Sequence, residues 1–162
     1  MMVTFKESDM NFSFDEKDVY RIEKSQLLSN VQMKAAECVC SVGNRLVFLE
    51  AKSSFSHPCS KENFDKNIQD VADKFSDSIH FLNAVFLRHA DEQLPQNIKN
   101  KNFRDVEYEF VLVIKKHKEE WLCPVSDQLK SYMRHTLKLW NVPDIRVKVM
   151  TEEMARKNRY VL

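Results

Sequence analysis

The chain of 162 residues is 43% hydrophobic and 30% charged, and its 25 basic and 24 acidic side chains give a formal net charge of +1. This composition excludes a disordered chain and indicates one soluble globular domain, residues 1–162, with a core of ordinary size. No stretch approaches the roughly 20 apolar residues of a membrane-spanning helix, the N-terminus lacks the apolar core of a signal peptide, and the four cysteines then suggest reduced thiols in the cytoplasm.

Alternating apolar side chains predict an extended segment at the N-terminus. The alternation surrounds a polar turn at residues 6–9 and indicates a hairpin or an extended edge. The apolar positions are Val3, Phe5, Met10, Phe12 and Phe14. Residues 19–24 fit either a strand or the end of a short helix, and the pattern leaves both open. Residues 26–32 are polar enough to predict a loop.

A Gly43-Asn44 pair between two apolar runs predicts a β-hairpin over residues 38–49. Glycine accepts the positive φ that a short hairpin turn requires, and Gly43 is the single glycine of the chain. A two-residue loop places Glu37 directly opposite Glu50. A four-residue loop keeps this pairing, whereas a three-residue loop would shift it by one residue.

The predicted register brings three ionisable side chains onto one face of the hairpin. Glu37 and Glu50 face each other, and Lys52 points the same way because it lies two residues further along the strand. Two facing carboxylates repel each other and raise each other's pKa unless a cation lies between them. Mg²⁺ or Mn²⁺ with oxygen ligands removes this conflict. An ammonium group beside such an ion can orient a water and stabilise charge on a phosphate.

The remainder of the chain predicts two helices and two further strands. Ser60 is a candidate N-cap for a long helix with apolar residues at spacings of three and four over residues 64–86. The apolar run at 108–114 is typical of an inner strand. Ser126 is a candidate cap for a second helix that reaches Trp140, and alternation at 145–149 predicts a last, half-exposed strand.

Glu37, twelve intervening residues and then Glu50-Ala51-Lys52 resemble the PD-(D/E)XK motif of restriction-endonuclease-like nucleases. The resemblance covers residues 19–90 and extends by topology to the C-terminus. It implies an α/β fold with a mixed β-sheet flanked by helices. The first acid of the family is usually aspartate, often after proline, whereas Ala36-Glu37 stands here.

The resemblance implies a Mg²⁺- or Mn²⁺-dependent endonuclease, a hydrolase of phosphodiester bonds, and it favours DNA over RNA as the substrate. A dedicated DNA-binding domain is usually more basic than this chain. The small size and neutral charge therefore suggest that targeting comes from a homodimer or a partner subunit, as in a restriction, repair or phage-defence assembly.

The same resemblance assigns roles to individual residues. Glu37 and Glu50 are expected to bind the metal, joined by Glu23 and the backbone carbonyl of Ala51, and Lys52 is expected to position a water. Candidate contacts to the nucleic acid lie on the long helix and in the following loop. They are Gln69, Lys66 and Lys74, followed by Lys99, Lys101 and Arg104. For each of these, a solvated polar surface is the competing interpretation.

Other functions are weaker alternatives. Cys38-x-Cys40 and His57-Pro58-Cys59 could suggest zinc, but neither spacing matches a zinc knuckle, and Cys38 and Cys40 should point into the core, away from Glu37. A catalytically inactive nuclease-fold module for protein or nucleic-acid interaction is the main alternative, favoured by the glutamate at position 37. The third is an unrelated α/β binding protein with an accidental E-x-K.

Overall fold

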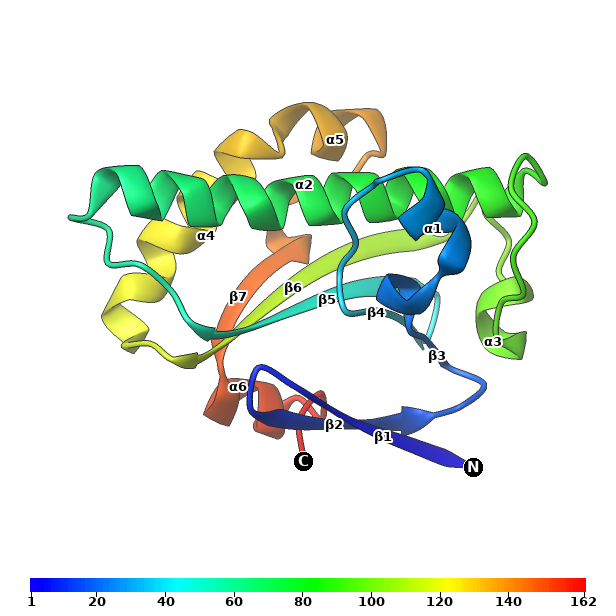
Figure 1. Ribbon diagram of the computed structural model, residues 1–162, viewed down its shortest axis with the longest axis horizontal. Helices are drawn as coiled ribbons and strands as arrows, with labels where there is room; N and C mark the ends of the chain where they lie inside the picture. Colours follow the sequence, from blue (N-terminus) through cyan, green and yellow to red (C-terminus); the bar gives the residue numbers. More distant parts are fainter.

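A five-stranded mixed β-sheet forms the centre of the computed structural model, which describes residues 1–162 (Figure 1). The strands lie side by side in the order β3-β4-β5-β6-β7. β3, β4 and β5 are antiparallel neighbours, whereas β5, β6 and β7 run parallel. Their bounds are β3 Val19–Tyr20, β4 Cys38–Val42, β5 Arg45–Ser54, β6 Glu107–Lys116 and β7 Val147–Thr151. The predicted α/β class with a mixed sheet and flanking helices is confirmed.

Helices cover one face of the sheet, and a hairpin with a short helix covers the other (Figure 1). The first layer contains α2 (Lys61–Phe86), α4 (Leu122–Tyr132) and α5 (Arg134–Leu139). On the opposite side lie the hairpin of β1 (Met2–Glu7) and β2 (Met10–Asp15) and the helix α6 (Glu152–Lys157). The α2 side holds the larger apolar core, with 29 buried residues against 14 on the hairpin side.

The β4–β5 hairpin has the predicted register. Val42 pairs with Arg45 and Cys38 with Leu49, across the two-residue turn at Gly43 and Asn44. Gly43 has φ of 58°, the left-handed conformation that a short turn requires and that glycine adopts without steric cost. One step beyond the strand, the Glu37 amide donates a hydrogen bond to the Leu49 carbonyl at 3.0 Å. Glu37 therefore continues the ladder and lies opposite Glu50.

Two of the early predictions are resolved and one is wrong. The N-terminal alternation forms the β1–β2 hairpin, whose turn lies at Ser8 and Asp9. Residues 19–24 contain both a strand and a helical turn, because β3 is followed by a 3₁₀ turn at Ile22–Lys24. The loop predicted at 26–32 is instead the short helix α1 (Gln26–Asn30), since the Ser25 hydroxyl caps it by accepting from the Leu28 amide.

The second half of the chain follows the predicted order with shifted boundaries, except that the single helix predicted to reach Trp140 is divided into α4 and α5. The long helix begins after Ser60 as predicted, although that side chain makes no capping hydrogen bond. The helix expected to start at Ser126 begins at Leu122 and tolerates Pro124 in its first turn, where backbone amides lack helical partners. The last strand begins at Val147, because residues 144–146 form a 3₁₀ turn. A further short helix, α3 (Gln96–Lys99), lies in the connection before β6. None of the helices combines the length and apolar character that crossing a bilayer requires.

Candidate active site

A fully buried glutamate lies under α2 at the centre of the sheet. Alternation along β5 turns Phe48, Glu50 and Lys52 toward the α2 side, where Phe48 enters the larger core. The Glu50 side chain is 0% exposed, and its Oε1 atom accepts a hydrogen bond from Lys74 Nζ at 2.6 Å. Lys52 Nζ lies 3.3 Å from the same oxygen and also donates to Asp70 of α2 at 3.0 Å. Glu50 therefore lies between two ammonium groups.

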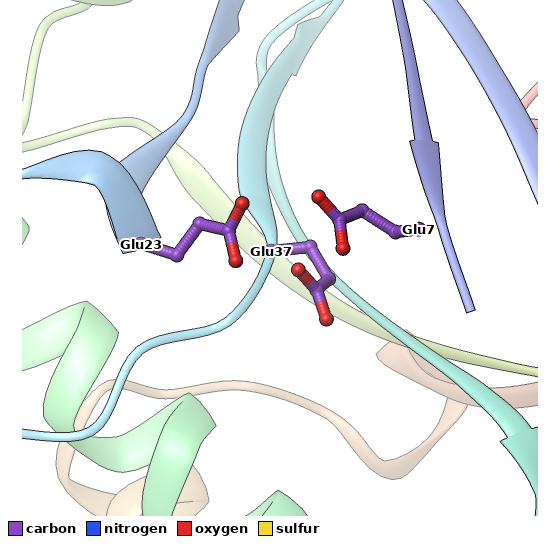
Figure 2. Close-up of side chains that lie close together, drawn as sticks. All are labelled: Glu7, Glu23 and Glu37. Atoms are coloured by element: carbon purple, nitrogen blue, oxygen red, sulfur yellow. The ribbon is translucent and has the colours of Figure 1, made fainter.

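Three further carboxylates converge near Glu50, at the point where β4 begins. Figure 2 shows Glu7, Glu23 and Glu37 arriving from separate segments with their carboxylates close together. One carboxylate oxygen of each lies within 4.8 Å of the others. Glu7 ends β1, Glu23 lies in the 3₁₀ turn after β3, and Glu37 precedes β4. The chain thus assembles an acidic cluster from residues 30 positions apart.

The Arg21 guanidinium neutralises part of this cluster. It donates to both Glu7 and Glu23, and its Cζ atom lies 3.8 Å from the centre of the Phe5 ring. Arg21 does not pair with Glu37, whose Oε2 atom is buried without any hydrogen-bond partner. Two acids of the cluster are therefore satisfied by an arginine and the third is not.

The charge state of the cluster is uneven. Burial, together with the neighbouring carboxylates of Glu23, Glu50 and Glu7, raises the pKa of Glu37 to about 9. Burial also acts to raise the pKa of Glu23, but hydrogen bonds from Glu37 and Arg21 outweigh it and lower that pKa. At neutral pH and without a bound cation, Glu37 therefore carries a proton and Glu23 is ionised.

The pKa values of Glu50 and its neighbours are set by burial and by the two lysines. Complete burial raises the pKa of Glu50, while the ammonium groups of Lys74 and Lys52 act in the opposite direction. Burial disfavours the charge on Lys74, yet the adjacent Glu50 carboxylate outweighs it and raises the pKa of Lys74. Burial likewise acts to raise the pKa of Asp70, but Lys52 outweighs it and holds that pKa below its usual value. Lys74 remains cationic beside a carboxylate that has one unpaired oxygen, Oε2.

The available donor atoms suit a hard divalent cation. The buried Oε2 atoms of Glu37 and Glu50 both lack partners, and a buried carboxylate oxygen without a partner is costly. The Ala51 carbonyl accepts one hydrogen bond, from the Ser8 hydroxyl at 2.9 Å, and retains a second lone pair. Carboxylate and carbonyl oxygens are the ligands that Mg²⁺ and Mn²⁺ prefer.

The predicted site residues are placed as follows. Glu50 and Lys52 lie together on the α2 side, and the β4–β5 register places Glu37 opposite Glu50. The carboxylate oxygens that gather within 4.8 Å of one another are those of Glu37, Glu23 and Glu7, and Glu50 is not among them. Lys74, predicted to contact substrate, pairs directly with Glu50. The other expected contacts to nucleic acid are exposed or partly exposed, namely Gln69, Lys66, Lys99, Lys101 and Arg104. Of these, Lys66 pairs with Glu62, and Lys101 donates to the Gly43 carbonyl.

Sequence reasoning missed Glu7, Arg21 and Asp70. Glu7 carries no local signal, because it closes an N-terminal strand far from the hairpin in the sequence. Asp70 could have been found, since it precedes Lys74 by one helical turn and so lies on the same face of α2.

The cysteines lie away from the acidic cluster. Cys38 and Cys40 are buried in the core on the hairpin side, with their Sγ atoms 3.6 Å apart. This is the predicted orientation, opposite to Glu37. Cys59 is exposed, and its amide donates to His57 Nδ1 at 3.0 Å.

Comparison of the chain with family models, with curated proteins and with solved structures finds no match.

Proposed function

We propose that this protein is a metal-dependent nuclease that hydrolyses phosphodiester bonds, with DNA favoured over RNA and with a restriction-endonuclease-like fold. One observation carries the proposal. Two buried glutamates, Glu37 and Glu50, each leave an oxygen unpaired on the same side of the sheet, and Lys52 Nζ lies 3.3 Å from Glu50. A protein gains nothing in stability from such oxygens, whereas a cation-binding site requires them.

The residues divide into ligands and a cationic group. Glu37, Glu50 and the Ala51 carbonyl would hold Mg²⁺ or Mn²⁺, with Glu23 as a further carboxylate. When bound, the ion would acidify a water and neutralise charge on the phosphate. Lys52 is held by Glu50 and Asp70, so its ammonium group is fixed where it can orient a water and stabilise developing negative charge.

The chain offers a matched control for mutagenesis. Glu109 is also 0% exposed on a central strand, and Lys148 Nζ lies 2.9 Å from it. Glu109 packs with Tyr160 on the hairpin side of the sheet, away from Glu37 and Glu50. Glu109→Gln and Lys148→Met therefore disturb a buried Glu–Lys pair of the same type without touching the proposed centre.

The experiment compares cleavage of supercoiled plasmid in Mg²⁺, in Mn²⁺ and in chelator. Wild type is expected to cut with metal, and Glu50→Gln or Lys52→Met is expected to lose at least about 100-fold in rate, as for removal of one preorganised electrostatic group. Glu109→Gln and Lys148→Met should keep the rate if folded. Equal cutting by all variants would identify a contaminant, and absence of cutting on DNA and RNA would reject the nuclease.

A second candidate is a catalytically inactive module with the same fold. It is favoured by the two lysines that lie against Glu50 Oε1 and by Arg21, which pairs with both Glu7 and Glu23. Such a network can be purely structural. Thermal unfolding with and without Mn²⁺ separates the two candidates, because a cation that binds the folded state raises the melting temperature.

Targeting by a homodimer or by a partner subunit remains part of the proposal. The near-neutral net charge of +1 provides little general attraction to a phosphate backbone.

A further inference from the structure

We propose that the N-terminal β1–β2 hairpin completes the metal centre and that Glu7 is one of its ligands. The inference rests on the proposed function, because it assigns a further ligand to the same centre. It adds a residue from outside the sheet that carries the E-x-K sequence. Glu7 lies thirty residues before Glu37, at the end of a separate two-stranded sheet.

The spacing of the oxygens fits one cation. A carboxylate oxygen from each of Glu7, Glu23 and Glu37 lies within 4.8 Å of the other two. Metal–oxygen bonds of about 2.0–2.6 Å place any two ligand oxygens at most about 4–5 Å apart. The three acids therefore need only small side-chain adjustments to share an ion, and Figure 2 shows all three carboxylates gathered in one place.

A cluster of acids alone does not require a ligand, but the state of Glu37 does point to one. Its side chain is 8% exposed, and its Oε2 atom has no hydrogen-bond partner. Arg21 satisfies Glu7 and Glu23 without reaching this oxygen. The orphaned oxygen lies in the one carboxylate of the three that is buried, next to two acids whose counter-ion is the Arg21 guanidinium.

The hairpin is fixed firmly enough to present a ligand. The Ser8 hydroxyl donates to the Ala51 carbonyl at 2.9 Å, and Lys115 Nζ donates to the Asp9 carbonyl at 2.7 Å. These two contacts hold the hairpin turn against β5 and β6, immediately beside Glu7. The Ser8 contact also joins the turn to Ala51, which follows Glu50 in the chain. The turn that follows Glu7 is therefore held by the Ala51 carbonyl, one of the proposed ligands.

Arg21 defines the competing, metal-free arrangement. Its guanidinium occupies oxygens of Glu7 and Glu23 and stacks on Phe5 of the same hairpin. A divalent cation that takes these oxygens has to replace the arginine as their counter-ion. The hairpin would then be tied to the sheet through the ion rather than through Arg21.

The test is calorimetric titration of the purified protein with MnCl₂ alone. Glu7→Gln is expected to weaken Mn²⁺ binding at least about tenfold, as expected for loss of one charged ligand. Asp9→Asn is the matched control. Asp9 lies in the same turn, but its carboxylate is 68% exposed and pairs only with Lys6. The Mn²⁺ affinity of Asp9→Asn should therefore stay within about twofold of wild type.

A second variant protects the test against misfolding. Glu7→Asp keeps the negative charge near Arg21 but withdraws the carboxylate by one methylene, so it should also weaken binding while the metal-free melting temperature stays close to wild type. Equal Mn²⁺ affinity in wild type, Glu7→Gln and Glu7→Asp, with binding lost in Glu37→Gln, would overturn the role of Glu7 and leave the proposed metal centre standing. Absence of Mn²⁺ binding to wild type would overturn both.

Discussion

The ammonium group of Lys74 lies 2.6 Å from Oε1 of the fully buried Glu50, at the place where α2 crosses β5. Removing one partner of a buried ion pair leaves an uncompensated charge, at a cost of about 3–5 kcal/mol. Lys52 stays 3.3 Å from Glu50, so Lys74→Met should destabilise the protein by about 3 kcal/mol, the lower end of that range. Denaturant unfolding at pH 7 measures this loss of free energy of unfolding.

A double-mutant cycle checks the cause. Glu50→Gln/Lys74→Met should cost less than the two single substitutions added together, because the neutral glutamine no longer needs the ammonium group. Additive costs would show that the pair is not coupled.

The pH dependence of stability should reveal the protonated Glu37. Its pKa is about 9 in the folded protein against an ordinary value of 4.5, so between these values the folded state holds one proton more than the unfolded state. Stability from this group is therefore lost as pH rises, by up to about 1.4 kcal/mol per pH unit. Unfolding between pH 7 and 8.5, without metal, is the measurement.

Glu37→Gln is the control for that window. It should flatten the slope and exceed wild type in stability at pH 8.5. The raised pKa of Glu50 acts in the same direction. The lowered pKa of His117 contributes only below its usual value of 6.5, outside the window. A stability that rises with pH in wild type would contradict the buried, protonated state.

Metal binding should release the same proton. Because a ligand carboxylate has to be ionised, Mn²⁺ affinity should increase with pH by up to about tenfold per unit below the pKa of Glu37. Calorimetric titrations at pH 6.5, 7 and 7.5, repeated in buffers of different ionisation enthalpy, count the protons released. A binding constant that does not change with pH would mean that Glu37 is not a ligand.

Arg21 should weaken metal binding by competing for Glu7 and Glu23. Arg21→Met removes a positive charge in contact with both acids while keeping an apolar side chain against Phe5. We expect about tenfold tighter Mn²⁺ binding, which corresponds to about 1.4 kcal/mol. Arg45→Met is the control, since Arg45 pairs with the buried Glu109, at 2.8 Å, on the other side of the sheet. Unchanged or weaker binding by Arg21→Met would contradict competition.

The sequence alone predicted the parts that depend on local rules. A single Gly-Asn turn determines the pairing of β4 with β5, and this pairing places Glu37 opposite Glu50. The periodicity of α2 and the continuous apolar run of β6 are equally local. Boundaries were predicted less well where tertiary contacts decide them, as at Leu122, where a helix begins four residues before the expected cap.

The composition of the acidic cluster could not be predicted in this way. Glu7 reaches Glu37 only because the turn of the β1–β2 hairpin is held at Ala51, beyond the start of β4, and no periodicity encodes that docking. Lys74 was predicted as a substrate contact, and the sequence did not reveal that its place on the inner side of α2 directs it to Glu50. Which of several polar helix residues turns inward depends on the charge buried beneath it.

The docking of β2 also links the two ends of the chain. Phe12 forms a β-bridge with Val161, and the Leu162 amide donates to the Asn11 carbonyl at 2.9 Å. During synthesis these contacts can form only after residue 162 has been added. The β1–β2 hairpin thus gains these two anchors only when translation of this segment is finished.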